Sequence, residues 1–261
     1  MNIIISGGHS GMGFELTKKL LAEGHQIGLI VRNEKRKAET QQLFPSEDNP
    51  KIFIADLSNR DQIALVAKEI QSNYGKLDGI FNNAGVLLDK LYFSDYGNEL
   101  QLEINAISPY LLTKSLLPLF EKTKNPFVVN TATGGLNSKK FIDIAAFKNP
   151  KKFTKLMGSY LDSKLTLVAL MNQLSNDTKD VRFISVDPGS IKTKMTAGDG
   201  MPFWLKPIRN LFFKLPEQGA QNLYDGAFSN SIKGSGIYVS GGKVKDMQAN
   251  IDTQQIDELL K

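Results

Sequence analysis

Seven short apolar runs recur along this chain, each bounded by turn-forming residues, and helical periodicities lie between them. The runs cover residues 2–5, 26–31, 51–55, 77–81, 126–130, 181–186 and 236–239. Helical spacing is clear in 13–24 and in 58–74, where Ser58 is the expected N-cap. Strands that alternate with helices and are apolar nearly throughout form parallel sheets covered on both faces. The pattern predicts an α/β fold, a Rossmann-type doubly wound parallel sheet of about seven strands with helices on both faces.

A chain of 261 residues can bury one sizeable core, so we expect residues 1–261 to form a single domain. Two stretches depart from the alternating pattern. Residues 134–157 are polar and rich in lysine, whereas residues 201–215 hold the only tryptophan and three phenylalanines. Ligands bind such sheets beyond the carboxyl ends of the strands, so we expect both stretches to be insertions at the mouth of a site.

The first apolar run ends in a glycine-rich turn, Ser6-Gly7-Gly8-His9-Ser10-Gly11-Met12-Gly13. Glycine lets a backbone turn tightly and approach a ligand, and a helix that begins here aims free N–H groups at a phosphate. The turn therefore predicts a dinucleotide site, although glycine turns also join strands to helices with nothing bound. The candidate contacts are Gly7, His9, Ser10, Gly11, Met12 and Gly13.

The residues that follow the second and third runs indicate the adenosine half of such a ligand. Arg32 stands where a guanidinium can grip a ribose 2′-phosphate, which favours NADP over NAD. Asp56 stands where it can accept the adenine amino group. The alternatives are an ordinary surface arginine and a carboxylate that caps the next helix. Asn33 and Leu57, next to these two residues, complete the expected adenosine contacts.

The fourth run ends in Phe81-Asn82-Asn83-Ala84-Gly85. Small residues suit a loop against which a cofactor lies, and paired amides can tie neighbouring strands together. We therefore expect Asn83, Ala84 and Gly85 at the cofactor, with an ordinary turn as the alternative.

Tyr160 and Lys164 are four residues apart in a helical pattern, so their side chains share one helix face. A nearby ammonium favours the phenolate form of tyrosine, so this pair can move a proton to or from a carbonyl or alcohol oxygen near neutral pH. Tyr110 and Lys114 have the same spacing, so the spacing does not by itself identify a catalytic pair.

Composition narrows the function classes. The chain has no cysteine and only two histidines, which argues against disulfides, thiolate chemistry and a metal site. Its net charge of +5 is spread along the sequence and suits a phosphate-bearing ligand or a solvated basic surface better than a nucleic acid. No run of about 18 apolar residues could span a bilayer, and a strand at residue 2 leaves no room for a signal peptide. We expect a cytoplasmic protein without a transmembrane segment.

The order of these motifs resembles the short-chain dehydrogenase/reductase family over nearly the whole chain. The family's Thr-Gly-x-x-x-Gly-x-Gly motif corresponds to Ser6–Gly13, with serine in place of threonine. Asp56 falls on the adenine-contacting acid of the family, and residues 82–85 fall on its Asn-Asn-Ala-Gly motif. Tyr160 and Lys164 fall on its Tyr-x-x-x-Lys motif.

The resemblance also implies roles for residues that spacing alone does not single out. Asn105 matches an asparagine that supports a water and a proton path to the catalytic lysine. Tyr110 lies in the same helix as Asn105, which removes the second Tyr-Lys pair from consideration. Residues 187–193 resemble the family's Pro-Gly segment, in which the Ile191 backbone and the Thr193 hydroxyl would hold the nicotinamide carboxamide. Pro188 and Gly189 complete this set.

The main departure from the family pattern is Thr133, which occupies the position of the catalytic serine. Threonine keeps the hydroxyl that orients a carbonyl, but its methyl group restricts rotamer and space. Ser138 is the alternative hydroxyl. Arg32, the long gap from Thr133 to Tyr160 and the segment 216–221 are similar to the retinol dehydrogenase and protochlorophyllide reductase branch, whose members usually use NADP.

The resemblance implies an NADPH-dependent oxidoreductase that transfers a hydride between nicotinamide and the carbonyl or alcohol group of a small or apolar substrate. Tyr160 would exchange the proton, while Lys164 would hold the ribose hydroxyls and lower the pKa of the tyrosine. Thr133 would hydrogen-bond the substrate oxygen, and Asn105 would complete the catalytic set. The alternative is a catalytically weak or inactive NADP-binding sensor of the same fold.

Residues 201–215 leave three interpretations open. An apolar lid over a hydrophobic substrate is the simplest. Lysines and Arg209 beside the aromatic residues also suit peripheral contact with a membrane surface. A homo-oligomer could bury the same residues in a subunit interface.

Overall fold

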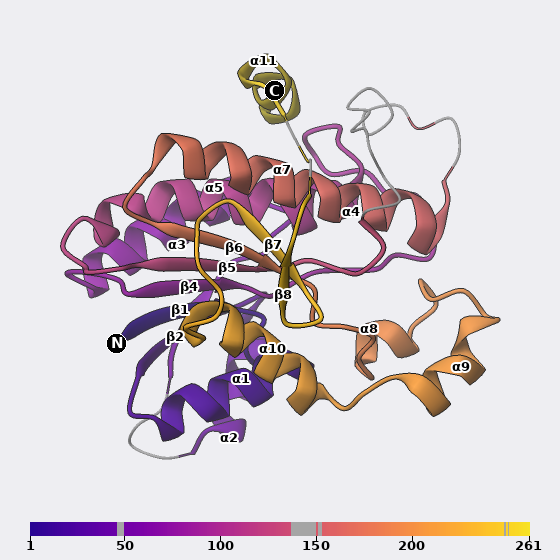
Figure 1. Ribbon diagram of the computed structural model, residues 1–261, viewed down its shortest axis with the longest axis horizontal. Coiled ribbons are helices and arrows are strands. Elements are labelled where there is room, and N and C mark those ends of the chain that lie inside the picture. Colours follow the sequence, from indigo (N-terminus) through magenta and orange to yellow (C-terminus); the bar gives the residue numbers. More distant parts are fainter. Residues whose placement is uncertain (46–49, 137–149, 151–152, 248, 250) are drawn as a thin grey trace.

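The computed structural model describes the chain from Met1 to Lys261 except residues 46–49, 137–149, 151–152, 248 and 250. The described strands form one eight-stranded sheet in the order β3-β2-β1-β4-β5-β6-β7-β8 (Figure 1). They are β1 (Asn2–Ser6), β2 (Gln26–Val31), β3 (Lys51–Ile54), β4 (Gly79–Asn82), β5 (Phe127–Thr131), β6 (Arg182–Val186), β7 (Ile237–Ser240) and β8 (Lys243–Lys245). Every neighbouring pair from β3 to β7 is parallel, which confirms the predicted sheet.

β8 is a strand that the apolar pattern did not predict. It pairs antiparallel with β7, with Ser240 opposite Lys243. Gly241 and Gly242 form the two-residue connection with φ angles of 60° and 73°, a conformation that tight hairpins require and glycine adopts readily. All of β8 is exposed, so it has no buried apolar side chains from which it could be predicted.

Helices cover both faces of the sheet, as predicted, with α1 and α10 on one side and α3, α5 and α7 on the other (Figure 1). The helical segments are α1 (Gly11–Ala22), α2 (Glu34–Leu43), α3 (Arg60–Asn73), α4 (Leu100–Leu102), η1 (Glu103–Ile107), α5 (Ser108–Leu116), η2 (Leu117–Phe120), η4 (Lys155–Tyr160), α7 (Leu161–Asp177), α8 (Lys194–Ala197), α9 (Leu205–Phe212), α10 (Pro216–Phe228) and α11 (Thr253–Leu260). In the described part of the chain, no helix has the length and apolar character needed to cross a membrane.

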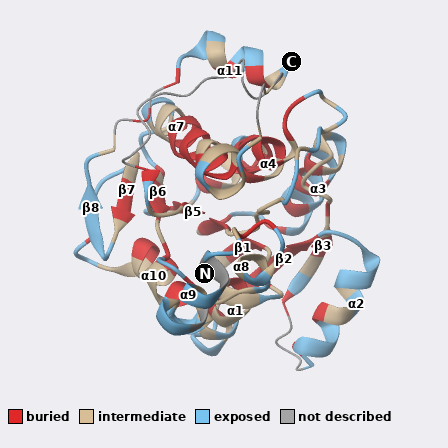
Figure 2. Ribbon diagram, turned by 90° about the vertical axis from the view of Figure 1, so that its right-hand side faces the viewer, coloured by how far each residue is buried: buried red, intermediate tan, exposed pale blue. Residues whose placement is uncertain are grey.

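Side chains along β1 alternate between two cores, one on each face of the sheet. Ile3 and Ile5 pack with Leu16 of α1 and Leu223 of α10. Ile4 packs with the cluster formed by α3, α5 and α7. Figure 2 shows the buried residues concentrated in the strands and on the helix faces turned toward them.

α3 begins at Arg60, two residues later than the periodicity predicted. Its N-cap is Asn59, whose Oδ1 accepts a hydrogen bond from Gln62 N at 3.0 Å. The prediction of Ser58 as the N-cap is wrong because the Ser58 hydroxyl donates instead to Asp56 Oδ1, at 2.7 Å.

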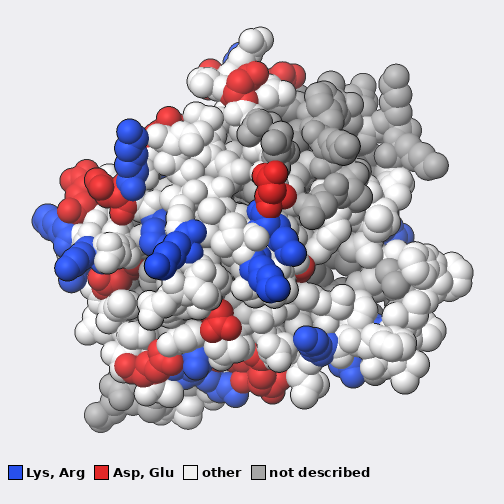
Figure 3. All heavy atoms as spheres, in the orientation of Figure 1, with Lys and Arg blue, Asp and Glu red and all other residues white. Residues whose placement is uncertain are grey.

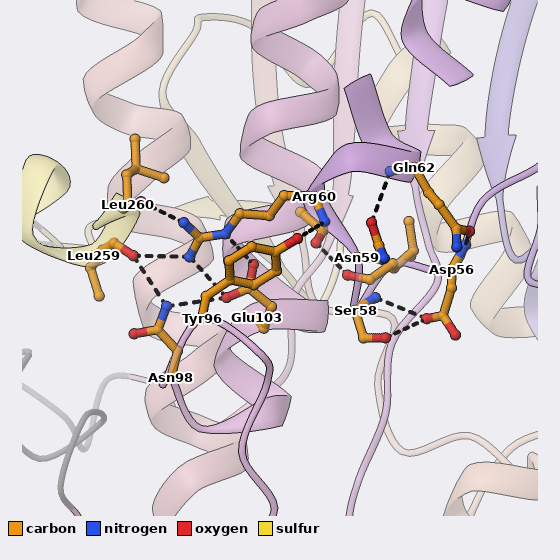
Figure 4. A network of polar contacts seen from close by, with 12 residues as sticks. Asp56, Ser58, Asn59, Arg60, Gln62, Tyr96, Asn98, Glu103, Leu259 and Leu260 are labelled. Carbon is orange, nitrogen blue, oxygen red and sulfur yellow. Dashed lines mark hydrogen bonds and ion pairs between the residues drawn. The ribbon is translucent and has the colours of Figure 1, made fainter. Parts of the chain in front are cut away.

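A network of polar contacts joins the start of α3 to η1 and to the C-terminal helix α11 (Figure 4). Arg60 donates to the two oxygens of Glu103 at 2.8 and 3.0 Å, and to the carbonyls of Leu259, at 3.2 Å, and Leu260. Asn98 Nδ2 donates to Glu103 Oε2 at 3.1 Å and to the Leu259 carbonyl at 3.2 Å. Arg60 and Asn98 thus satisfy carbonyls at the end of α11 that have no partner within the helix.

The connections that follow β1 and β4 pack on opposite faces of the sheet, since α1 covers one face and α5 the other. The carboxyl ends of these two neighbouring strands therefore form a switch point, where doubly wound sheets bind their ligands. The glycine turn follows β1 and residues 83–85 follow β4, so both predicted cofactor motifs meet there.

Candidate active site

The glycine turn after β1 is packed too closely for larger residues. Gly7 has a φ of 68°, and a Cβ placed on it would lie 3.0 Å from Ala84 Cα. A Cβ on Gly13 would lie 2.2 Å from the Gly7 carbonyl oxygen and 2.5 Å from Asn83 Nδ2. α1 begins at Gly11, so the N–H groups of its first turn, which have no partner within the helix, lie at this turn. The turn is a cradle with the donors that a pyrophosphate needs.

His9 lies within this turn, and its Nδ1 is buried without a hydrogen-bond partner among the described residues. Burial lowers the pKa of His9, and Arg36 and Lys194 lower it further. The imidazole is therefore neutral at pH 7 and offers a polar atom that a ligand can satisfy. Ser10 is the N-cap of α1, but its side chain makes no capping hydrogen bond. Both side chains fit a phosphate-bearing group bound at the turn.

Arg32 and Asp56 form an ion pair beside the ends of β2 and β3, with Arg32 Nε 2.8 Å from Asp56 Oδ2. The other oxygen of Asp56 accepts from the backbone N–H and the hydroxyl of Ser58. Burial raises the pKa of Asp56, but the hydrogen bonds from Ser58 and Arg32 outweigh it, so the pKa lies below its usual value. Asp56 is thus an ionised carboxylate that orients Arg32. It does not cap α3, because Asn59 does.

The other two residues expected at the adenosine position have partners within the protein. Asn33 is the N-cap of α2, and its Oδ1 accepts from Arg36 N at 3.0 Å. The Leu57 carbonyl accepts from the hydroxyl of Ser108 at the start of α5. These bonds hold the loops after β2 and β3 in place beside the Arg32–Asp56 pair.

Amide side chains after β4 tie neighbouring strands together, as predicted. Asn82 Nδ2 donates to Asn130 Oδ1 at 2.9 Å and to Thr113 Oγ1 at 3.0 Å. Asn83 Nδ2 donates to the Ser6 carbonyl at 3.3 Å, which fastens this loop to the end of β1. The loop that borders the predicted cofactor position is therefore held from both sides.

Tyr160 ends η4 and is 9% exposed. Burial raises the pKa of Tyr160 to about 12, while the hydrogen bond with Thr133 lowers it and the charge of Asp187 raises it. Thr133, at the family's serine position, therefore acts on the tyrosine. The hydrogen bond to a substrate oxygen that the resemblance implies for Thr133 stays a prediction.

Lys164 lies one turn after Tyr160 and is 2% exposed. Its Nζ donates to the Thr131 carbonyl at 2.7 Å and lies 6.0 Å from the centroid of the Tyr160 ring. Burial lowers the pKa of Lys164 to about 8. Burial of the phenol is the largest cause of the raised pKa of Tyr160. The expected effect of Lys164 on that pKa stays a prediction.

Asn105 lies in η1, a π-helical turn of the kind often found at functional sites. Its Oδ1 accepts from Val86 N at 2.8 Å, and its Nδ2 donates to the Val86 carbonyl at 2.9 Å and to Ser163 Oγ at 3.1 Å. Gly85 lies between Asn105 and Lys164. A Cβ there would be 3.0 Å from Asn105 Oδ1 and 3.4 Å from Lys164 Nζ. The structure thus brings Asn105 and Lys164 to the same loop.

The segment after β6 begins with a turn held by its own side chain. Gly189 has a φ of 85°, and its N–H donates to Asp187 Oδ1 at 2.9 Å. The Pro188 carbonyl accepts from Asn222 of α10 at 2.9 Å. These bonds fix the Pro-Gly segment at the carboxyl end of the sheet.

Ile191 and Thr193 follow in the same segment, and Ile191 is only 3% exposed. Thr193 is the N-cap of α8, and its Oγ1 accepts from Thr196 N at 3.2 Å. Its Cγ2 would be 3.5 Å from a Cβ placed on Gly11, so this segment lies against the glycine turn. The Thr193 hydroxyl, expected to contact nicotinamide, is used here in a helix cap.

Three side chains at the site were not singled out from the sequence. Ser6 Oγ accepts from the N–H groups of Asn83, at 3.2 Å, and Ala84, at 3.1 Å. Tyr238 of β7 donates to the Thr133 carbonyl at 2.8 Å, and Asp187 Oδ2 accepts from Ser240 Oγ at 2.9 Å. Their strands were predicted, but apolar runs carry no signal for which side chains at a strand end face the site.

Ser138, the alternative hydroxyl, lies outside the described residues, as does most of the stretch 134–157. Tyr110 is 5% exposed and belongs to the core on the α3, α5 and α7 face. The second Tyr-Lys pair is therefore separate from the group around Tyr160.

Comparison with known proteins agrees with this geometry. The sequence profile described as short chain dehydrogenase matches residues 1–200, which include the glycine turn, Asn105, Tyr160 and Lys164. The chain belongs to the short-chain dehydrogenase family. It is thus an oxidoreductase of that family.

Curated relatives of this short-chain dehydrogenase match most of its length. Retinol dehydrogenase 11 of Mus musculus is 25% identical over 252 residues, which cover 94% of this chain and 77% of the relative. Short-chain dehydrogenase chry4 of Gibberella zeae is 29% identical over 197 residues, which cover 76% of this chain and 73% of the relative. The first match supports the similarity to the retinol dehydrogenase branch.

Solved structures share the fold of this short-chain dehydrogenase. Salutaridine reductase from Papaver somniferum has a TM-score of 0.69 at 21% identity, covering 91% of this chain and 98% of its own. A short chain dehydrogenase of Shigella flexneri complexed with NADP has a TM-score of 0.70 at 23% identity, covering 91% and 95%. At these identities the likeness concerns the fold alone.

Proposed function

We propose that this short-chain dehydrogenase is NADPH-dependent and transfers a hydride between nicotinamide and the carbonyl or alcohol group of a small or apolar substrate. The observation that carries the proposal is the buried Tyr160, with Lys164 Nζ 6.0 Å from the centroid of its ring and with Thr133 as the neighbour that lowers its pKa. Proton donation needs an acid that is protonated at the working pH, and carbonyl orientation needs a hydroxyl beside it. Tyr160 is the acid, and Thr133 carries the hydroxyl.

The residues present fit a dinucleotide. A Cβ on Gly7 or Gly13 would fill the turn after β1, and His9 Nδ1 has no other partner among the described residues. The N-terminus of α1 would hold the pyrophosphate, and residues 188–193 would hold the carboxamide. When bound, the cofactor supplies or accepts the hydride.

The side chains of this chain manage the proton. Tyr160 donates its phenolic proton to the substrate oxygen during reduction and takes it back during alcohol oxidation. Thr133 holds the same oxygen by its hydroxyl. Lys164 binds the ribose hydroxyls of the cofactor, and Asn105 fixes the loop after β4 through both backbone groups of Val86.

The charges at the adenosine end favour NADP over NAD. The Arg32 side chain is 70% exposed, and its Nε is oriented by Asp56, so its other N–H groups can receive a 2′-phosphate. Arg36 and Lys194 lower the pKa of His9 and Glu39, the ion-pair partner of Arg36, raises it, so a net positive charge lies near the same turn. A phosphate dianion suits this group better than a neutral ribose hydroxyl does.

We also propose that the start of the stretch 201–215, with the residues before it, covers the substrate. Met201 is 4% exposed, and a Cβ on Gly200 would lie 2.1 Å from the Leu87 carbonyl oxygen. Lys155 of η4 donates to the Asp199 carbonyl at 2.9 Å. The segment thus spans from the loop after β4 to the helix that carries Tyr160, as a substrate lid would.

The test is the loss of absorbance at about 340 nm from NADPH, with NADH in parallel, over a panel of aldehydes, ketones and quinones. We expect turnover with NADPH to exceed that with NADH. Tyr160→Phe keeps the ring but removes the proton donor, and kcat should fall by about 10²–10⁴-fold. Tyr110→Phe, in the core, is the matched control. Turnover that survives Tyr160→Phe contradicts the assignment, whereas NADPH binding without turnover of any carbonyl favours the sensor alternative.

A further inference from the structure

α9 carries its apolar face outward. Trp204, Ile208, Leu211 and Phe212 follow the spacing of one helix face, Leu215 follows shortly after the helix ends, and all five are exposed. Leu211 and Phe212 are 80% and 74% exposed, and Phe203 just before the helix is 83% exposed. A surface helix normally turns such a face to the core. This patch, residues 203, 204, 208, 211, 212 and 215, is called the α9 apolar face below.

The opposite side of α9 is fastened to the protein. Arg209 donates to Thr196 Oγ1 at 3.1 Å and to the Thr193 carbonyl at 3.2 Å. Just after the helix, Lys214 N donates to the Ser190 carbonyl at 2.9 Å, and the Lys214 carbonyl accepts from Lys192 N at 2.8 Å. These bonds fix the helix with Arg209 turned toward the rest of the protein, so its outward apolar face is a property of the fold.

Basic residues flank α9 in the sequence. Lys194 and Lys214 are exposed and Lys192 is partly exposed, against the acidic Asp199 and Glu217 nearby in the sequence. In Figure 3 most of the described atoms of the projection on the right, the side on which Figure 1 labels α9, are uncharged on the face shown. An exposed apolar face flanked in the sequence by lysines matches the layers of an anionic bilayer surface.

We propose that the α9 apolar face docks on the surface of an anionic lipid bilayer. Tryptophan and phenylalanine favour the interfacial layer, lysine side chains reach up to the headgroups, and side chains exposed by three quarters can enter lipid without rearrangement. A second copy of the chain fits less well, because stable interfaces need about 20–30 residues on each side in close complementarity. A projecting helix of eight residues does not offer that surface.

The proposal does not depend on catalysis, but it has a consequence for the proposed function. Thr193 and Ser190, which hold α9, belong to the segment expected at the nicotinamide. Docking through α9 therefore brings the mouth of the candidate site to the lipid surface, where an apolar carbonyl substrate concentrates.

Trp204 is the only tryptophan of the chain, so intrinsic fluorescence reports directly on this face. The full-length protein is mixed with vesicles of phosphatidylcholine, with or without phosphatidylserine, and both Trp emission and co-sedimentation are measured. We expect a blue shift and binding about tenfold stronger with phosphatidylserine, reduced by high salt. Leu211→Asp should abolish both signals. Leu65→Asp, a matched change at a 64% exposed leucine of α3, should leave them intact.

Three outcomes overturn the proposal. The first is no binding by a wild-type protein that is folded by circular dichroism, or equal binding to neutral and anionic vesicles. The second is a blue shift that needs no vesicles and rises with protein concentration together with dimer formation, which assigns the face to a second copy. The third is a Trp change that appears only with NADPH and a carbonyl substrate, which assigns the helix to lid closure.

Discussion

Asp187 places a carboxylate near Tyr160 and adds to the effect of burial on the pKa of that tyrosine. Tyrosine donates a proton only while protonated, so carbonyl reduction slows as pH rises through the tyrosine pKa, and alcohol oxidation, which needs the phenolate, speeds up. Asp187→Asn removes the charge, its amide oxygen can still accept from Gly189 N, and its NH2 group can donate to the Ser240 hydroxyl, which reverses that hydrogen bond. We expect this change to lower the pKa of Tyr160, so both transitions move to lower pH.

The measurement is kcat/KM against pH in both directions, once a substrate is identified. Asp180→Asn, in the exposed turn before β6, is the control for a general change in charge. A profile that does not move in Asp187→Asn, or that moves equally in Asp180→Asn, shows that Asp187 does not act on Tyr160 through its charge.

Thr133 is tested by separating its hydroxyl from its shape. Thr133→Ser keeps the hydroxyl and should keep activity, whereas Thr133→Val keeps the shape and should lower kcat by about 10²–10³-fold, the effect of losing one donor to the reacting oxygen. Steady-state kinetics of both variants decide the point. Near-normal turnover by Thr133→Val would show that another hydroxyl, such as that of Ser138, holds the substrate oxygen.

For single residues, the identity of the site residues was easier to predict from the sequence than their pKa values and hydrogen bonds. The order of Thr133, Tyr160 and Lys164 in the sequence was enough to suggest a set that the structure brings together. The high pKa of Tyr160 was not predictable, because it arises from burial and from the charge of Asp187. Sequence spacing does not show that the Asp187 carboxylate lies near this tyrosine. For the same reason the sequence did not show that Lys164 is held by the Thr131 carbonyl.

Among the elements, α11 depends on a buried ion pair. The Arg60 side chain is 13% exposed and that of Glu103 is fully buried. Arg60→Met keeps the length of the side chain but leaves the Glu103 carboxylate and the last carbonyls of α11 without this donor. Removing one partner of a buried pair costs about 3–5 kcal/mol. We expect the free energy of unfolding in urea to fall by about that amount, and α11 to become a site of early proteolysis.

Arg36→Met is the matched control, because the Arg36–Glu39 pair is exposed and such pairs contribute about 0–1 kcal/mol. Both variants are compared without cofactor. A loss in Arg60→Met no larger than the loss in Arg36→Met contradicts the role of this pair in holding α11.

Periodicity predicted α1, α3 and α7, whereas it placed no helix in the stretch 201–215 and gave no orientation for one. The apolar spacing of α9 is that of a core helix, yet hydrogen bonds from Arg209 to Thr193 and Thr196 turn that face outward. The N-cap of α3 is Asn59 and not Ser58 because a single side chain, Asp56, accepts the hydrogen bond of the serine hydroxyl. Local polar contacts of this kind decide boundaries and orientation, and they leave no mark on hydrophobic spacing.

For the molecule as a whole, a cofactor that binds only the folded chain stabilises it. NADPH at about 100 times its Kd adds about 2.7 kcal/mol, which raises Tm by about 5–10 °C in a chain of this size. We expect NADP(H) to raise Tm more than NAD(H) at equal concentration, and Arg32→Ala to remove that difference. Thermal shift measurements check both. Equal shifts for the two cofactors with the wild-type protein contradict the role given to Arg32.

The seven apolar runs predicted the number and direction of the parallel strands because each is buried on both faces. They did not predict the order of the strands, since all the buried runs are alike in composition. Order follows from which face each connecting helix covers, and it places β1 and β4 side by side at the switch point. The motifs after these two runs were therefore predictable as neighbours only through the family resemblance.

The β7–β8 hairpin has a consequence for solubility. A sheet that ends in a long apolar strand presents unpaired N–H and C=O groups on which another chain can build. Here that edge is a three-residue strand, exposed throughout and carrying Lys243 and Lys245. Such a strand is too short and too charged to template further growth. At high local concentration, copies of the protein therefore do not associate by pairing their sheets along this edge.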